Sequence, residues 1–239
     1  MANNKLIKIE GDNLQKVGNA ISITNKVLAF NINKINAKNE TLFISDIGKK
    51  VRKSLAKEYY EMGLYKMDPD FSPNNDELVP DYDEAIRNYT LAIDFDPNYS
   101  EAYAMRGLTT YYLNEYVGAL KDYTKAIEIE PNERYYYGRA NVYGKIGNYE
   151  EAIRDLTIAI ELAPQLSNLY EGRALIKEKI GNYEAAVQDL TIAIEITPMK
   201  SYYYNRGNSK NKLGDKNGAY LDWKKAAELG HKDAQKKIN

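Results

Sequence analysis

Between residues 54 and 231 the apolar positions of the chain recur at the spacing of α-helices. In the segment 149–162, for example, Ala152, Leu156, Ala159 and Ile160 fall on one face of a helix, and the small alanines let a neighbouring helix approach closely. Another amphipathic stretch, YYYGRANVYGKIG, precedes this segment, and the Gly147-Asn148 pair at its end is typical of a helix stop and a turn. The pattern therefore predicts a unit of two helices joined by a tight turn.

This unit repeats about every 34 residues. Each copy ends on a run such as AIEIEP, and its proline ends a helix because it lacks an N–H and restricts the residue before it. The prolines, spaced by 34, 33 and 34 residues, are Pro97, Pro131, Pro164 and Pro198, and the turn tyrosines 15 residues before them are Tyr82, Tyr116, Tyr149 and Tyr183. The regular units are 100–132, 133–166, 167–199 and 200–231. The first unit, 46–99, is longer, and its excess is predicted to form an enlarged loop, 68–81.

The repeating unit resembles the tetratricopeptide repeat. The Tyr-x-x-Arg-(Gly/Ala) of the first helices, the Gly-(Asn/Asp)-Tyr turns, the Ala-Ile pairs and the terminal prolines carry the resemblance, over about three quarters of the chain. The ending AAELGHKDAQ resembles the close of the related Sel1-like repeats. The resemblance implies an all-α fold: an α-solenoid of about five helix-turn-helix repeats in a right-handed superhelix, whose concave groove binds a peptide or a partner protein.

Residues 1–45 lie outside the repeats and are predicted to form a small N-terminal extension, so that the array with its C-terminal cap occupies 46–239. KLIKIE and TLFI predict two short strands. A helix capped by Asp12 runs to about residue 30, and its apolar face either caps the open end of the array or docks on a partner. A further helix is predicted to begin at about Asp46 and to run into the first repeat.

Two rows of charged residues follow the repeat. In the first helices they are Arg106, Arg139, Arg173 and Arg206, and in the second helices Asp122, Asp155, Asp189 and Asp222. In the first unit Met62 and Asn88 occupy the corresponding places, so both partners are absent together. We therefore favour ion pairs between packed helices over a row of anion-binding arginines.

Candidate catalytic chemistry is sparse. The chain has one histidine, His231, and no cysteine, so the residue spacing of a zinc site and any disulfide are excluded. No Ser-His-Asp set has geometric support, and no glycine-rich phosphate loop follows a strand. We expect a protein that is not an enzyme, with no cofactor, no bound metal and no small-molecule substrate.

The spacing of the first helices places a set of side chains on the groove. Asparagine can both donate to and accept from a peptide backbone, and tyrosine is a rigid amphipathic contact. The predicted partner-binding residues are Tyr111, Arg134, Tyr137, Asn141, Lys145, Glu171, Tyr204, Asn208 and Asn211. The alternative is that they are simply exposed polar positions. At the places that chaperone-adaptor repeats use to grip a C-terminal carboxylate, only Arg134 and Asn205 have suitable chemistry, in units that are not adjacent, so we do not expect such a clamp.

Charge and hydropathy limit the class of partner. The net charge is −1, although residues 1–66 carry 12 Lys/Arg against 6 Asp/Glu. No run of about 18 apolar residues exists, so no membrane span is expected, and the N-terminus lacks a secretory apolar segment, which favours a cytoplasmic location. A protein or peptide partner is the leading expectation, and nucleic acid is disfavoured. Two alternatives stay open: a self-associating accessory module of an enzyme complex, which would form a homo-oligomer, or a binder of nucleic acid or anionic surfaces through the basic 49–57 helix, with Lys49, Lys50, Arg52, Lys53 and Lys57.

Overall fold

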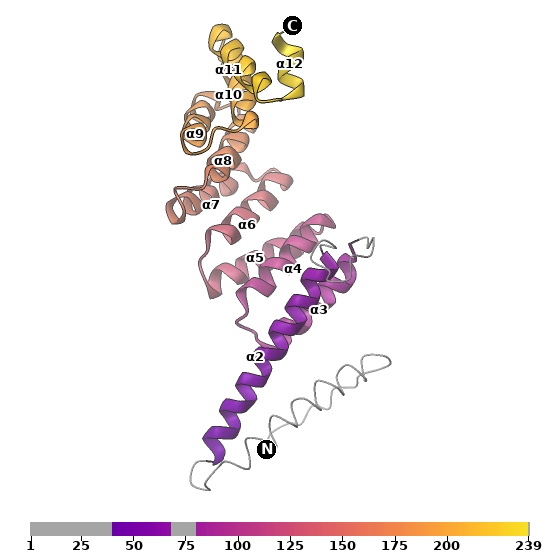
Figure 1. The fold of residues 1–239 in the computed structure, drawn as a ribbon. Helices are drawn as coiled ribbons and strands as arrows, with labels where there is room; N and C mark the ends of the chain where they lie inside the picture. The colour runs from indigo at the N-terminus through magenta and orange to yellow at the C-terminus, as the bar shows by residue number, and fades with distance from the viewer. Residues whose placement is uncertain (1–39, 68–79, 239) are drawn as a thin grey trace.

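The protein is an elongated array of packed helices, shown in Figure 1. The structure, a computed structural model, describes residues 40–67 and 80–238, and these two ranges form eleven α-helices and no strand. The strand predicted for KLIKIE, the helix that Asp12 was expected to cap and the loop segment 68–79 lie outside the described residues.

The helices associate as five consecutive pairs, and each pair packs on the next. The pairs are α2 (Glu40–Met67) with α3 (Tyr82–Phe95), α4 (Ser100–Tyr112) with α5 (Tyr116–Ile129), α6 (Glu133–Ile146) with α7 (Tyr149–Leu162), α8 (Ser167–Lys179) with α9 (Tyr183–Ile196), and α10 (Lys200–Lys212) with α11 (Lys216–Glu228). A short last helix, α12 (Lys232–Ile238), packs against α11. The predicted all-α array of about five helix-turn-helix repeats is confirmed.

The ends of the helices follow from local sequence. α5 ends at Ile129, the capping residue Glu130 is extended, and Pro131 follows, because a proline disfavours helical backbone in the residue before it. The turn within the third pair needs Gly147, whose φ of 83° lies in the left-handed region. Asn114, with φ of 63°, occupies the same place in the second pair, which asparagine tolerates better than most side chains.

The prediction of a short strand at TLFI is wrong. These four residues, 41–44, lie in α2, which begins at Glu40 rather than at about Asp46. Four β-prone residues do not form a strand by themselves, because a strand needs a partner strand for its backbone hydrogen bonds. A growing helix satisfies its own backbone with each added residue, so the neighbouring helical segment extends through the run.

The core consists of buried alanines packed against larger aliphatic and aromatic side chains. In the third unit Ala152 and Ala159 are fully buried beside Leu156, which confirms the apolar stripe expected from the sequence. Glycine is required where an aromatic ring crosses a first helix. A Cβ on Gly138 would lie 2.3 Å from Cε1 of Tyr123, so only glycine fits there. The close approach of α5 and α6 brings Tyr123 to the surface of a pocket described below.

Candidate functional site: a pocket between α4 and α6

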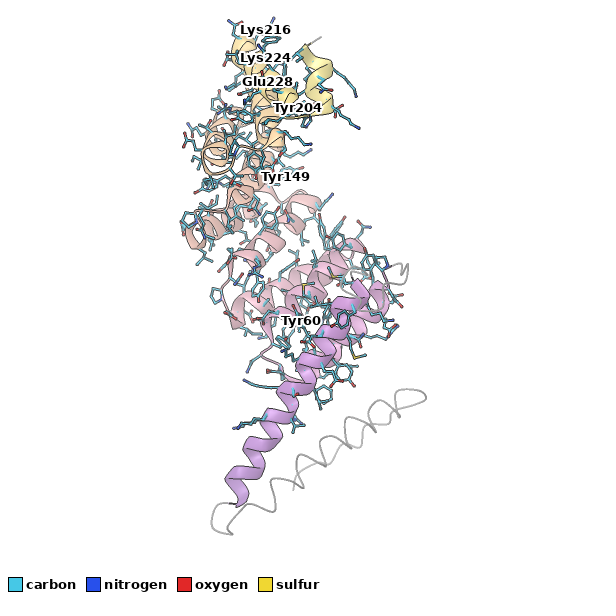
Figure 2. All side chains as sticks on the ribbon, in the orientation of Figure 1. Tyr60, Tyr149, Tyr204, Lys216, Lys224 and Glu228 are labelled. Carbon is cyan, nitrogen blue, oxygen red and sulfur yellow. The ribbon has the colours of Figure 1, made fainter. Side chains whose placement is uncertain are left out.

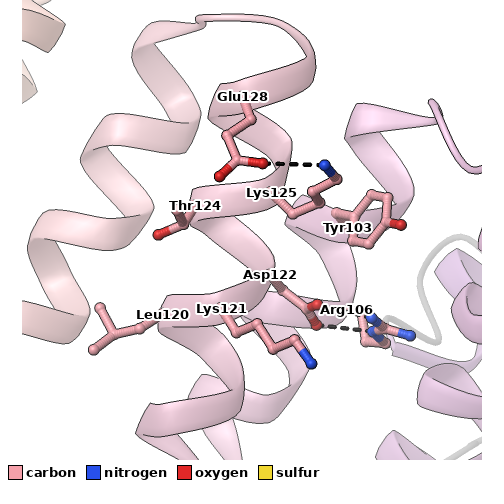
Figure 3. A pocket seen from close by; sticks show the side chains of 8 residues that line it. All are labelled: Tyr103, Arg106, Leu120, Lys121, Asp122, Thr124, Lys125 and Glu128. Atoms are coloured by element: carbon pink, nitrogen blue, oxygen red, sulfur yellow. Dashed lines mark hydrogen bonds and ion pairs between the residues drawn. The ribbon is translucent and has the colours of Figure 1, made fainter.

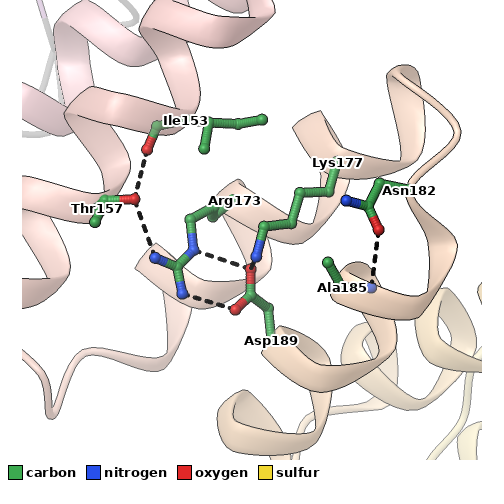
Figure 4. A network of polar contacts seen from close by, with 7 residues as sticks. All are labelled: Ile153, Thr157, Arg173, Lys177, Asn182, Ala185 and Asp189. Carbon is green, nitrogen blue, oxygen red and sulfur yellow. Dashed lines mark hydrogen bonds and ion pairs between the residues drawn. The ribbon is translucent and has the colours of Figure 1, made fainter.

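The arginine and aspartate rows form ion pairs, as the sequence predicts. Arg173 donates from Nε and Nη2 to Asp189, over 3.0 Å and 2.8 Å, and its Nη1 donates to Oγ1 of Thr157 in the preceding unit (Figure 4). Lys177 adds a further bond to the same carboxylate, at 2.7 Å. Equivalent bonds of 2.7–2.9 Å join the pairs Arg106–Asp122, Arg139–Asp155 and Arg206–Asp222. The arginines therefore orient packed helices and are not free to bind anions.

The first unit lacks this pair. Asn88 occupies the aspartate's place and is only 5% exposed, yet its Nδ2 has no hydrogen-bond partner among the described residues. Met62 stands where the other units have arginine and offers no acceptor beyond a weak thioether sulfur. The first helix pair is consequently held without the ion pair that orients the other four.

One surface pocket, about 580 Å³, is lined by α4 and α5 (Figure 3). Arg106 in its wall already binds Asp122, and Lys125 binds Glu128 at 3.0 Å. Bonding to Asp122 also raises the pKa of Arg106, which stabilises the charged form of the pair. Two of the pocket's cations are thus already paired within the protein, and we do not assign a ligand to it.

The second pocket, about 390 Å³, lies between the first helices α4 and α6; we call it the α4–α6 pocket. It brings together four of the nine partner-binding residues predicted from the sequence: Tyr111, Arg134, Tyr137 and Asn141. It also contains four residues outside that predicted set: Leu108, Tyr112, Tyr123 and Gly138. Its walls are therefore mainly aromatic, with one cation and one amide.

Two tyrosines of the α4–α6 pocket, Tyr111 and Tyr123, are neutral phenols at ordinary pH. Burial raises the pKa of Tyr111 and of Tyr123 above the usual value of 10.0. Tyr111 makes an edge contact with Tyr112, with ring centroids 5.8 Å apart, so these rings support one another. The charge of the pocket comes from Arg134, whose side chain is 84% exposed and lies 3.6 Å from Glu133. This arrangement can hold an apolar side chain beside a carboxylate or a peptide carbonyl.

The remaining predicted residues do not join this pocket. Lys145 and Asn211 are exposed on α6 and α10. Glu171 accepts a hydrogen bond from Asn205, at 3.1 Å, and burial raises the pKa of its carboxyl. The prediction that this whole set forms one groove is not tested by the structure, and it stays a prediction.

Two predicted residues, Tyr204 and Asn208, are engaged in contacts at the C-terminal end of the array. The ring of Tyr204 stacks on His231, with centroids 4.2 Å apart, and the carbonyl of Asn208 accepts from Nε1 of Trp223 at 3.2 Å. Tyr137 is also partly used in packing, against the core around Leu156. These three side chains therefore also take part in contacts within the array, and their role in binding a partner stays a prediction.

The basic segment of α2 extends beyond the array (Figure 1). All five of its cations are exposed: Lys49, Lys50, Arg52, Lys53 and Lys57. No helix of the described ranges is both long and apolar enough to cross a membrane. Within the same ranges, no three His, Cys, Asp or Glu side chains are grouped so as to hold a metal ion.

Comparisons with known proteins agree with the fold. The family model described as tetratricopeptide repeat matches residues 134–166, which is the third unit. A structure titled "Crystal structure of MamA" is 25% identical, with a TM-score of 0.60, and the match covers 65% of this chain and 92% of that one. MamA from Desulfovibrio magneticus RS-1 is 20% identical, with a TM-score of 0.63 and coverage of 73% and 94%. YrrB, titled as a repeat protein of this type with an unusual peptide-binding site, is 19% identical, with a TM-score of 0.60 and coverage of 75% and 90%. No curated protein matches the sequence.

Proposed function

We propose that this chain, whose third unit matches the family model for the tetratricopeptide repeat, is a protein–protein interaction scaffold that holds an extended segment of its partner in the α4–α6 pocket. The observation that carries the proposal is the convergence of Tyr111, Tyr137, Asn141 and Arg134 in one hollow. Aromatic rings supply contact area with few rotatable bonds, and an amide can pair with a peptide backbone.

The charge of the pocket selects the partner segment. Arg134 is exposed and its nearest carboxylate, Glu133, lies at 3.6 Å, so the guanidinium keeps donors available for an incoming group. Tyr111 and Tyr123, whose pKa burial raises, are uncharged phenols and do not compete for that charge. A segment with an apolar or aromatic side chain next to an acidic residue or a backbone carbonyl fits these walls best. The proposed role is binding without catalysis, and the one histidine, His231, is used in its stack with Tyr204.

The test starts from peptides selected by the full-length chain from a random library. The affinity of the best peptide is then measured by fluorescence anisotropy on the parent and on an Arg134→Ala/Asn141→Ala variant. We expect the variant to bind at least tenfold more weakly, which corresponds to a loss of about 1.4 kcal/mol. Arg154→Ala, an equally exposed arginine on α7, serves as the control and should bind as the parent does. Equal affinity of the parent and the double variant would exclude the pocket as the binding element.

A second candidate function rests on the basic segment of α2, whose five cations are all exposed on a helix that extends beyond the array. Binding of nucleic acid through them would weaken steeply with salt, because phosphate contacts release counterions. A titration of a short duplex at two salt concentrations separates this function from groove binding, since the pocket contains only one cation, Arg134.

A further inference from the structure

In the first four units, certain residues of the second helix contact the following unit. The last unit has different residues at these positions. In four consecutive units a threonine of the second helix accepts a hydrogen bond of 3.0–3.1 Å from the arginine of the following unit. These threonines are Thr90, Thr124, Thr157 and Thr191. Lys224 occupies the corresponding place on α11, where no further unit follows, and its side chain is exposed.

Three neighbouring positions on α11 have changed as well. Tyr220, 48% exposed, stands where the other second helices carry a half-buried aliphatic residue. Lys216 replaces the turn tyrosine. Leu221, 65% exposed, replaces residues that are polar or charged in every other unit: Arg87, Lys121, Arg154 and Gln188. Because Lys216, Tyr220 and Lys224 are spaced by four residues, they form a line along α11. Figure 2 shows Lys216 and Lys224 at the outer end of the array.

This end of the molecule is basic, unlike the body of the array. Residues 200–238 carry 10 Lys/Arg against 4 Asp/Glu, whereas residues 80–199 carry 11 against 20. The acids of the basic end are already engaged: Asp222 with Arg206 and Lys210, Glu228 with Lys225, Asp233 with Lys236, and Asp215 with the N–H of Gly218. Six exposed lysines of this stretch form no ion pair with any described residue: Lys200, Lys212, Lys216, Lys224, Lys232 and Lys237.

We propose that this face of α11 binds an anionic lipid surface. Lysines reach lipid phosphates while their alkyl chains cover apolar neighbours, and exposed Leu221 and Tyr220 between them suit the boundary between headgroups and acyl chains. A nucleic acid would be attracted by the lysines but would gain little from Leu221. Stacking of a second copy of the array is disfavoured, because it would bury the ammonium of Lys224 where the other units present a threonine hydroxyl. The proposed surface is separate from the α4–α6 pocket, so the two functions can be tested independently.

The experiment is co-sedimentation of the full chain with vesicles of phosphatidylcholine and phosphatidylserine at a ratio of about 2:1, compared with vesicles of phosphatidylcholine alone. We expect binding to the anionic vesicles only, and we expect it to weaken as salt is added. Lys216→Glu/Lys224→Glu should lower the partition coefficient by more than about tenfold, since two attractive charges become repulsive. Leu221→Gln should lower it by at least about threefold, because its side chain no longer enters an apolar layer.

The matched control is Arg87→Glu/Arg154→Glu, which makes the same change in net charge at the places on α3 and α7 that correspond to Leu221. It should bind as the parent does. Equal binding to both kinds of vesicle, or to neither, overturns the proposal. Unchanged binding of the Lys216/Lys224 variant overturns it in favour of the basic segment of α2. A loss of binding to a single-stranded oligonucleotide in that variant, with no effect of Leu221→Gln on vesicles, overturns it in favour of nucleic acid.

Discussion

Arg139 binds Asp155 through two hydrogen bonds, from Nε at 2.8 Å and from Nη2 at 2.9 Å, between the two helices of the third unit. Both side chains are largely removed from water, so neither charge is well solvated if its partner is lost. We expect Asp155→Ala to lower the free energy of unfolding by about 3 kcal/mol, as is usual for one partner of a buried pair. The Arg139→Leu/Asp155→Leu variant should lose much less, since it leaves no buried charge. Urea unfolding of Asp155→Ala and of the double variant measures the two losses, and equal losses would contradict this expectation.

The first unit offers the reverse experiment. Asn88→Asp alone places a carboxylate in a buried site with no cation, and we expect it to cost roughly 2–3 kcal/mol. Adding Met62→Arg should recover most of that loss, because it supplies the partner that the other four units have. Thermal unfolding of the single and double variants is the measurement. A double variant less stable than Asn88→Asp would mean that Met62 and Asn88 do not face each other as the ion-paired residues do.

Gly138 should tolerate alanine poorly. The added methyl group would lie 2.3–2.7 Å from the ring of Tyr123, which is only 4% exposed and has little room to move. We expect Gly138→Ala to cost about 1–3 kcal/mol, the usual range for overpacking. It should also weaken peptide binding, because Tyr123 lines the α4–α6 pocket. Gly118→Ala is the control: nothing lies within van der Waals clash distance there, the nearest atom being 4.0 Å away, so a helical alanine should stabilise by about 0.5–1 kcal/mol.

Glu178 gives the protein a dependence on pH. Its carboxylate accepts a hydrogen bond from Ser209, yet burial dominates and raises the pKa of Glu178 above 4.5. A raised pKa means that the folded state holds the proton more tightly than the unfolded chain does. The contribution of this group to stability is therefore present below about pH 4.5 and is lost as the pH rises through the folded-state pKa.

Glu178→Gln should accordingly gain stability relative to the parent between pH 4 and pH 7, since glutamine keeps an acceptor for Ser209 and carries no charge to desolvate. The free energy of unfolding of both proteins at the two pH values gives the difference. Glu161→Gln, an exposed substitution on α7, is the comparison for the loss of one charge. If the stability gained by Glu178→Gln became smaller toward pH 7, the raised pKa assigned to Glu178 would be contradicted.

The sequence was sufficient to predict the array because its signals are local. Pro131 and Gly147 end helices through restrictions on their own backbone and that of their neighbours, whatever lies around them. The ion pairs were predictable for a different reason. Every unit with an arginine at the position of Arg139 has an aspartate at the position of Asp155, and the first unit lacks both. A contact between the two side chains explains this joint pattern. TLFI was misassigned because its β-prone side chains say nothing about whether a partner strand exists.

The site was harder to predict, because it depends on distances between units. Helical spacing selected Tyr111, Tyr137 and Asn141, and these three residues line one pocket between α4 and α6. The spacing of the first helices did not identify Tyr123, which lies on the second helix α5. Its ring reaches the pocket by packing over Gly138. Helical spacing also treated Tyr204 as free, because no periodic signal shows that the chain turns back after α11 and stacks His231 on that ring. Contacts of this kind come from tertiary packing.

Trp223 is the only tryptophan of the chain, and it lies in the last unit beneath the ammonium of Lys237, 4.5 Å from the ring. Its emission therefore reports the state of one end of the array, whereas circular dichroism averages over all the helices. In a linear array, where each unit contacts only its neighbours, the two signals need not change together. The difference between the unfolding midpoint followed by tryptophan emission and the midpoint followed by circular dichroism measures how far unfolding spreads from one unit to the next. The measurement needs no added label.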